Sequence, residues 1–517
     1  MRLAPPPGLP PDARHAEVTW RPAEEAERTA RRARLMLALN VPLAVWYFGW
    51  LLQPGRIGNA ALYGILIAAE VFNLVQAVGF WWTCARARVP AHRPPPRERV
   101  VVDVFIPVYN EPVEVVEATV AAAARMTGAD VMVTVLDDGH RAEMRRLAKR
   151  YGVRCIRRMK RTGAKAGNIN NALRRTKAPF VVVLDCDHVP DPSFLERTLG
   201  HMDDPRVAFV QTPQYYANAG RGGIAAASWS QQALFFGAIA MGKHGAGGIF
   251  CCGTNVLFRR TALKAAGGFP EDSITEDFEL SIQLHGRGWR SVYVPEVLAR
   301  GLGPEDMASY VSQQQRWARG CLSGISAALR ARLPLRLRLQ YLLSSMYFLT
   351  GWSVAVYMML PVVRMLTGAQ PLGGVSADQF LLHFAPYFGA ALLTVALAGG
   401  GAYTFAAFAL AAASFWIHIQ ASTLALLRRP ARFVVTPKLG SLRRQPRIVW
   451  PALAVIAILA GTAIVRVALD QRPGMLNNAA FAVLHIAVLL VGIWAALSPV
   501  RPARPRREAL VPARAEA

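Results

Sequence analysis

The chain alternates between long, uninterrupted apolar stretches and one central region of short apolar runs separated by polar residues. A stretch of about 20 apolar residues is long enough to cross the hydrocarbon core of a bilayer as a helix. Such stretches predict two transmembrane helices within 35–86, two within 341–398 and two within 449–500. A seventh apolar stretch, 404–427, is ambiguous by length alone. The pattern therefore predicts a membrane protein with a large non-membrane domain at 97–333.

Within this central domain, runs typical of strands alternate with segments typical of helices. The runs at 100–112, 131–140 and 153–159 have strand character, and helical segments at 113–126 and 142–151 separate them. Strands that alternate with helices predict an α/β domain with a mostly parallel sheet and right-handed crossovers. Ligands of such sheets bind at the carboxyl ends of the strands, so the residues that follow each strand are the candidates for function.

In the segment "VVVLDCDH" (181–188), an apolar run is followed by two carboxylates, Asp185 and Asp187. A continuous apolar run is typical of a strand buried on both faces, and residues i and i+2 point to the same side. Two carboxylates held this close require a cation or strong donors, and oxygen ligands suit Mg²⁺ or Mn²⁺ shared with a phosphate. The alternative is a strand end with solvated loop acids. Asn110–Glu111 and Asp137–Asp138, which end other predicted strands, argue against that alternative.

A lysine precedes the next predicted helix in "RTGAKAGNINNAL" (161–173). Lys165 and the exposed backbone N–H groups of a helix start can form an anion site. The motif is not a Walker sequence, and an ordinary surface lysine is the alternative.

The net charge of +26 concentrates where the apolar stretches end, as in 28–34, 86–99, 428–447 and 501–507. This is the positive-inside pattern of membrane proteins, and it also suits anionic headgroups and an anionic substrate. No recognition motif for nucleic acid accompanies the charge, so we expect no nucleic-acid partner.

Eight short motifs then occur in one order along the chain: "VYNEP" (108–112), "LDDG" (136–139), "KAGNINNAL" (165–173), "LDCDHVP" (184–190), "VQTPQYY" (210–216), "FCCGTN" (250–255), "TED" (275–277) and "QQQRW" (313–317). This set resembles the family 2 processive glycosyltransferases, and it is most similar to the catalytic subunits of bacterial cellulose synthase. The resemblance covers roughly residues 97–440. It implies a cytosolic glycosyltransferase domain of the GT-A type inserted between transmembrane helices.

The resemblance implies specific roles for the residues of these motifs. Asp137 and Asp138 would contact the uracil and ribose side of UDP, and Lys165 would also bind UDP. Asp185 and Asp187 would hold Mg²⁺ or Mn²⁺ on the diphosphate. The other substrate-binding positions that it implies are Tyr109, Glu111, Glu276, Gln313, Arg316, Trp317, Phe433, Thr436 and Lys438. The acceptor-binding positions that it implies are Cys252, Gly253, Thr254 and Trp317.

Asp277 would be the general base that takes the proton from an acceptor hydroxyl, and a single displacement would invert an α-linked donor to a β-linked product. The alternative for Asp277 is a helix N-terminal acid that favours the dipole, since "TEDFEL" opens an amphipathic segment. Arg316 would stabilise negative charge on the diphosphate. Trp317 would offer an aromatic face to a sugar, or it is simply a buried aromatic residue.

The segment "RFVVTPK" (432–438) resembles the gating loop of cellulose synthases, although a basic juxtamembrane linker is the alternative. If Lys438 reaches a cytosolic donor site, the chain crosses the membrane an even number of times between the domain and this loop. We therefore expect 404–427 to be an interfacial helix and 428–447 to be the loop. The N-terminal segment 1–34 and the tail 501–517 would then also be cytosolic.

The resemblance implies a multi-pass protein of the bacterial inner membrane that polymerises a cellulose-like β-1,4-glucan from UDP-glucose and translocates it. The growing polysaccharide, the bilayer and an export or periplasmic subunit are the partners implied. We expect no cyclic-di-GMP-binding PilZ domain after Lys438, because two apolar stretches and a short tail follow it, and "QQQRW" departs from the Gln-Arg-x-Arg-Trp of cellulose synthases. A synthase of chitin, curdlan or a mixed-linkage glucan is therefore an alternative, as is a non-catalytic scaffold.

Overall fold

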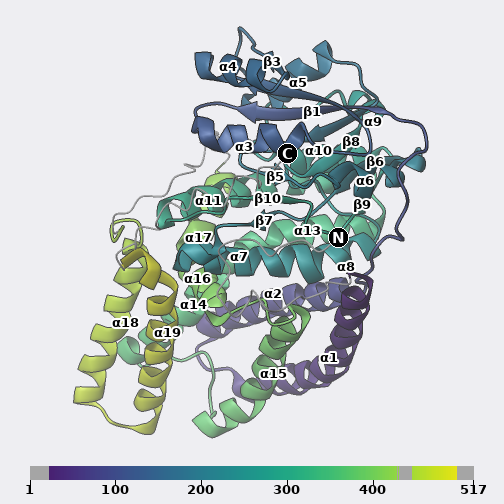
Figure 1. Cartoon of the computed structure of the whole chain (residues 1–517). Coiled ribbons are helices and arrows are strands. Elements are labelled where there is room, and N and C mark those ends of the chain that lie inside the picture. Colours follow the sequence, from purple (N-terminus) through teal and green to yellow (C-terminus); the bar gives the residue numbers. More distant parts are fainter. Residues whose placement is uncertain (1–21, 428, 430–444, 498–517) are drawn as a thin grey trace.

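The computed structural model describes residues 22–427, 429 and 445–497. A layer that contains the sheets lies on one side of the molecule, and the long apolar helices lie on the other (Figure 1). Three helices run between these two layers, namely α7 (Gly223–Leu234), α11 (Met307–Ser323) and α13 (Leu335–Met346). The region 97–333 therefore folds as an α/β unit that rests on a set of helices.

The main sheet has seven strands in this spatial order: β3 (Arg154–Ile156), β2 (Asp130–Asp137), β1 (Val101–Val108), β4 (Phe180–Val183), β8 (Val256–Arg259), β6 (Val207–Gln211) and β9 (Arg290–Tyr293). The first four strands pair in parallel, as do β6 and β9, whereas β8 is antiparallel to both of its neighbours. The sheet is thus mixed but mostly parallel. A smaller sheet consists of β5 (Val189–Pro190), β10 (Ala299–Gly301) and β7 (Tyr215–Tyr216).

The central strands are buried on both faces, which is why their sequences are nearly continuous apolar runs. In β4, Val182 packs into one hydrophobic cluster while Val181 and Val183 pack into another on the opposite face. In the pairing of β1 with β2, Val108 lies opposite Asp137, so both strands end at the same edge. The polar residues that follow these strands are therefore brought together.

Helices cover both faces of the main sheet. Those of the α/β unit are α3 (Val113–Ala123), α4 (Ala142–Arg150), α5 (Ala164–Arg175), α6 (Phe194–Thr198), α9 (Arg260–Ala266), α10 (Glu276–Gly286) and α12 (Ile325–Arg330). Helix α7 continues through a π-helical turn at Phe235–Ile239 into α8 (Ala240–Gly245). Helices α3 and α4 begin where the sequence predicts them and end slightly earlier.

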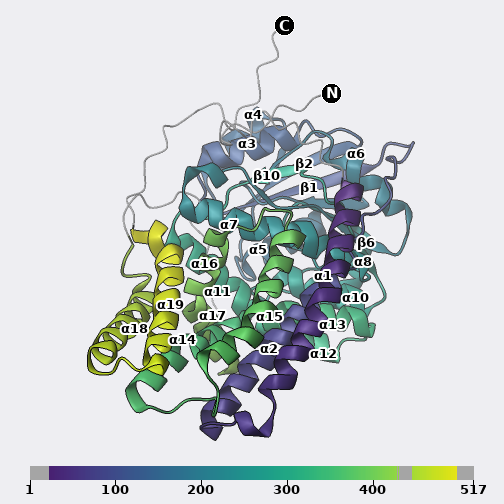
Figure 2. The same ribbon diagram turned by 90° about the horizontal axis from the view of Figure 1, so that it is seen from below.

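Six helices in the described part of the chain are long and apolar enough to cross a membrane. They involve α1 (Pro22–Leu51), α2 (Ala60–Cys84), α14 (Thr350–Thr367, continuous with α13 as a candidate span), α15 (Ala377–Ala398), α18 (Trp450–Leu469) and α19 (Pro473–Leu497). Helix α1 begins well before residue 35, where the first apolar stretch starts. Figure 2 shows α1, α2 and α15 gathered on one side, and α18 beside α19 on the other.

The ambiguous stretch at 404–427 forms a broken helix. It consists of α16 (Phe405–Ala413) and α17 (Phe415–Leu426), whose axes differ in direction by 44°. Helix α17 packs on α11: Ala421 and Ala318 are buried in one cluster, and Gln315 donates a hydrogen bond from Nε2 to Gln420 Oε1. The bend allows either a broken span or a segment that enters and leaves on one side.

Candidate active site

A cavity of about 420 Å³ opens at the carboxyl ends of β1, β2 and β4. Its walls come from the loops after these strands, the start of α5, the loop before β8, the start of α10 and one face of α11. The cavity brings together most of the site residues proposed from the sequence: Tyr109, Glu111, Asp138, Lys165, Asp185, Asp187, Cys252, Gly253, Glu276, Asp277, Gln313, Arg316 and Trp317. These residues span more than 200 positions of sequence, so only the tertiary fold assembles them.

Three potential metal ligands follow β4. One side-chain ligand atom from each of Asp185, Asp187 and His188 lies within 4.8 Å of the others. Asp187 and His188 are buried and Asp185 is partly exposed, and all three residues line the cavity. Two carboxylates and an imidazole form a donor set that suits Mn²⁺, and the two carboxylates also suit Mg²⁺. The residues present therefore fit a divalent cation.

His188 was not among the predicted residues, although it directly follows the Asp185–Asp187 pair. Its ring lies against β10, where a Cβ atom at Gly301 would come within 2.3 Å of His188 Nε2. Only the bare backbone of a glycine leaves room for the imidazole at this point. The acid pair and the histidine were both visible in the sequence, but the contact with β10 was not.

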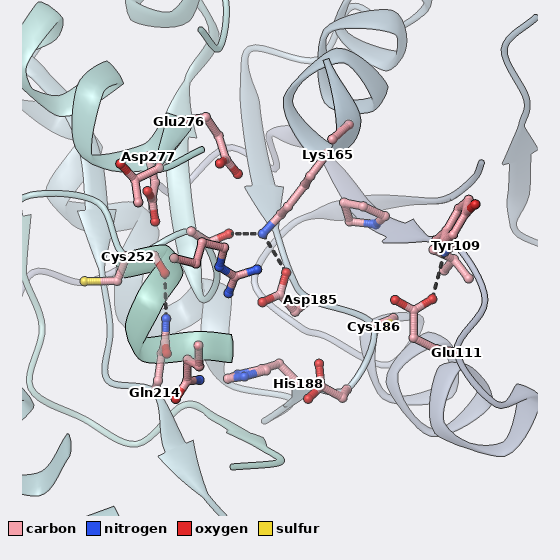
Figure 3. A pocket seen from close by; sticks show the side chains of 18 of the residues that line it. Tyr109, Glu111, Lys165, Asp185, Cys186, His188, Gln214, Cys252, Glu276 and Asp277 are labelled. Carbon is pink, nitrogen blue, oxygen red and sulfur yellow. Dashed lines mark hydrogen bonds and ion pairs between the residues drawn. The ribbon is translucent and has the colours of Figure 1, made fainter. Parts of the chain in front are cut away.

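Lys165 reaches into the centre of the cavity from the first turn of α5 (Figure 3). Its ammonium lies 2.6 Å from Asp185 Oδ1 and 2.7 Å from the carbonyl oxygen of Gly253. Burial alone would lower the pKa of Lys165, but the charges of Asp185 and Glu276 outweigh it and raise the pKa. Lys165 is therefore a firmly charged ammonium beside the candidate metal ligands.

Asp277 is the second residue of α10, and Phe278 N donates to its Oδ1 at 2.8 Å. Its other oxygen, Oδ2, faces the loop before β8, where a Cβ at Gly253 would lie only 2.8 Å away. Gly253 has a backbone φ of +84°, which residues with a Cβ atom rarely adopt. Burial and the charge of Glu276 raise the pKa of Asp277 to about 7, against the opposing effect of Lys165 and Arg316. A carboxylate with such a pKa can accept a proton near neutral pH.

Helix α11 supplies Gln313, Arg316 and Trp317 to the cavity wall. Their spacing of three and four residues places them on one face of the helix. The amide of Gln313 lies 3.4 Å from the hydroxyl of Tyr216, which also lines the cavity. Gln214, another lining residue from the "VQTPQYY" motif, donates to the carbonyl oxygen of Cys252 at 2.6 Å.

Two expected site residues lie behind the cavity wall. Asp137 is fully buried and accepts a hydrogen bond from Arg157 Nε at 2.8 Å, because β2 turns its side chain away from the cavity. Asp138, the next residue, takes the place at the wall. Thr254 is also buried, and its hydroxyl accepts a hydrogen bond from Asp185 N at 2.8 Å. Phe433, Thr436 and Lys438 lie outside the described residues.

The sequence is similar to those of known glycosyltransferases. Residues 180–418 match the model of the glycosyl transferase family group 2. The chain is 34% identical to a UDP-forming cellulose synthase catalytic subunit of Xanthomonas axonopodis pv. citri, over 61% of this chain and 46% of that protein. It is 29% identical to cellulose synthase 2 of Novacetimonas hansenii, over 92% of this chain and 32% of that protein. The chain thus spans less than half the length of these two relatives.

A solved structure has a similar fold over much of the chain. A mannosyltransferase from Pyrobaculum calidifontis, in complex with GDP-Man and Mn²⁺, superposes with a TM-score of 0.54 at 19% identity, over 71% of this chain and 99% of that one. At this level of identity the likeness concerns the fold. The expected GT-A type fold, flanked by apolar helices on both sides in the sequence, is confirmed.

Proposed function

Because this chain is a homologue of the bacterial cellulose synthases and carries a glycosyl transferase domain of family group 2, we propose that it is a processive, inverting hexosyltransferase. It polymerises a cellulose-like β-1,4-glucan from UDP-glucose and passes the product across the membrane. The observation that carries this proposal is one cavity that holds a metal-ligand cluster, a buried lysine and a carboxylate with a raised pKa.

The donor diphosphate would lie over Lys165 and Asp185. Asp185, Asp187 and His188 would hold a Mg²⁺ or Mn²⁺ ion, which as a Lewis acid neutralises charge on a departing diphosphate. The ammonium of Lys165 sits beside these ligands and supplies a second positive charge to the same group. Asp138, Tyr109 and Glu111 line the nucleotide side of the cavity at the ends of β1 and β2.

Asp277 would act as the base. Phe278 N holds its Oδ1, so Oδ2 is the atom that takes the proton from the acceptor hydroxyl. The oxygen so freed attacks the anomeric carbon of the donor while the bond from that carbon to UDP breaks, with inversion at the carbon. Arg316, on α11, would add positive charge to the cavity wall and stabilise the negative charge that develops on UDP.

The acceptor would enter between α11 and the loop before β8. Trp317 offers a planar face to a sugar ring, and Cys252 and Gly253 line the same cavity, whereas Thr254 lies behind its wall. Phe433, Thr436 and Lys438 would close over the donor. The protein would lie in the bacterial inner membrane, with the α/β unit and the bent pair α16–α17 on its cytosolic side. The six long apolar helices among the described residues support a membrane location, and the basic residues at the ends of the apolar stretches support this orientation.

A panel of UDP-sugars tests this proposal. The purified full chain in detergent is incubated with each donor and Mg²⁺ or Mn²⁺, and UDP release is followed. We expect turnover with UDP-glucose and an insoluble product that an endo-β-1,4-glucanase degrades. Turnover with UDP-N-acetylglucosamine alone would contradict the proposed substrate. A glucan that resists the endo-β-1,4-glucanase would contradict the proposed linkage. Absence of UDP release with every donor would contradict the proposal as a whole.

A further inference from the structure

One buried arginine links two walls of the cavity. Arg158, which is only 6% exposed, pairs with the carboxylate of Asp138 through two hydrogen bonds, Nε to Oδ1 at 2.8 Å and Nη2 to Oδ2 at 2.7 Å. The same guanidinium donates to the carbonyl oxygens of Thr162 at 2.5 Å and Ala164 at 2.7 Å. It therefore ties the end of β2 to the turn that begins α5.

That turn needs support from outside. Gly163 and Ala164 have φ values of 70° and 42°, and a residue with a Cβ is disfavoured at positive φ. Arg158 binds the carbonyl groups on both sides of Gly163, which fixes the direction of the turn. The guanidinium also packs on α5 itself: a Cβ at Gly167 would lie 2.5 Å from Arg158 Nη1.

The residue that follows this turn is Lys165. Its ammonium contacts Asp185 and the Gly253 carbonyl, so a change in the path of the turn moves the ammonium relative to both. Arg158 thus holds the side chain of Asp138 and the carbonyl group of Ala164, which directly precedes Lys165. A lysine at position 158 could not make the same contacts, because an ammonium lacks the fork geometry of a guanidinium.

We propose that Arg158 is a positioning residue for the nucleotide diphosphate: it sets the distance between Asp138 and Lys165, which together bind the donor. This inference rests on the proposed function, in which the cavity binds a UDP-sugar. It assigns Arg158 no contact with the substrate. Its loss should weaken binding of UDP through displaced partners while the fold is retained.

Arg260 provides a matched control. It is equally buried, pairs with Asp103 at 2.6 Å and donates to the carbonyl oxygen of Leu173 at 3.0 Å, but neither it nor its partners line the cavity. Arg158→Lys and Arg260→Lys therefore make the same chemical change in two similar networks. Only the first network reaches the cavity.

Binding of UDP with Mn²⁺ to the purified full chain is measured by titration calorimetry, and thermal unfolding is recorded for each variant. Arg158→Lys should raise the Kd for UDP on the order of tenfold. It should also raise KM for the UDP-sugar more than it lowers kcat. Arg260→Lys should lower the Tm and leave the Kd for UDP unchanged. An unchanged Kd in Arg158→Lys would contradict the inference, as would an equal rise in Arg260→Lys.

A second variant covers the case in which a lysine cannot be accommodated. Arg158→Ala leaves a space shaped for a guanidinium, so millimolar guanidinium should restore UDP affinity while urea at equal concentration should not. Restoration by both or by neither would contradict the positioning role. Failure of the proposed function is distinguishable, because wild-type protein that binds UDP but transfers no sugar would overturn the function and leave the binding comparison intact.

Discussion

The ammonium of Lys165 lies 2.6 Å from the carboxylate of Asp185, although the two residues belong to different elements, α5 and the loop after β4. The pair joins the start of a helix, a candidate anion site, to a candidate metal ligand. A diphosphate placed there would meet the lysine and the cation together, as a leaving group that carries negative charge requires. This pair is the reason to expect donor binding and turnover to depend on the same few side chains.

Lys165→Met should lower kcat by about a hundredfold and weaken UDP binding, because it removes a preorganised positive charge from the diphosphate site. UDP release from UDP-glucose measures the first effect and calorimetry the second. Lys149→Met, at an exposed lysine of α4, is the control and should behave as wild type. Wild-type turnover in Lys165→Met would remove the lysine from the mechanism.

The rate should fall in acid because of Asp277. Its pKa is raised to about 7 by burial and by Glu276, so protonation of the base begins near neutrality instead of near pH 4. We expect kcat/KM for the donor to fall tenfold per pH unit below about pH 7, since only the ionised carboxylate accepts a proton. Glu276→Gln removes a neighbouring negative charge, so the pKa of Asp277 should fall and the acidic decline in kcat/KM should begin at a lower pH. A flat profile between about pH 5 and 8 would show that another group takes the proton.

Gly301→Ala should weaken use of the metal. The added Cβ would lie 2.3 Å from Nε2 of His188, and β10 cannot yield easily because it pairs with β5 and β7. Displacement of a ligand or its support typically costs ten- to a hundredfold in metal affinity. Titration of activity with Mn²⁺ should show a rise of about tenfold in the concentration for half-maximal rate. Gly286→Ala, where the nearest atom lies at 3.4 Å, should leave this titration unchanged. If both variants needed the same Mn²⁺ concentration for half-maximal rate, His188 would be excluded from the metal site.

The bent pair α16–α17 should not cross the membrane. Arg319 on α11 donates from Nη2 to the carbonyl oxygen of Arg429 at 2.7 Å, which holds the end of this pair beside the helix that lines the cavity. A cysteine at the exposed Leu427 should therefore react with an impermeant thiol reagent only in inverted vesicles. A cysteine at Thr367, the last residue of α14, should react in intact cells, and wild type serves as the control for labelling of the native cysteines. Labelling of Leu427→Cys in intact cells would overturn this topology.

Periodicity was enough to predict the α/β unit, and the strand ends pointed to the acids of its candidate site, whereas the resemblance to family 2 glycosyltransferases implied most of the other site residues. Apolar runs that end in Asp138 or Asp185 predict parallel strands with polar carboxyl ends, and the structure places both residues at one cavity. The order of β8, antiparallel between β4 and β6, could not be predicted, because pairing depends on contacts between distant segments.

Other features depend on tertiary contacts that a sequence does not display. Asp137 and Asp138 are identical in type and adjacent, yet Arg157 holds the first away from the cavity and Arg158 holds the second at it. The role of Gly301 follows only from the ring of His188 lying against it. The same holds for α1, whose polar first half extends the helix back to Pro22 through packing that hydropathy does not register.

The rate of UDP release by wild type and by Asp277→Asn, each with UDP-glucose and Mn²⁺, tests the central claim most directly. The account predicts release by wild type that EDTA abolishes, and a fall of about a thousandfold in Asp277→Asn, which should still bind UDP. Release that survives EDTA, or an Asp277→Asn variant that turns over at the wild-type rate, would contradict it.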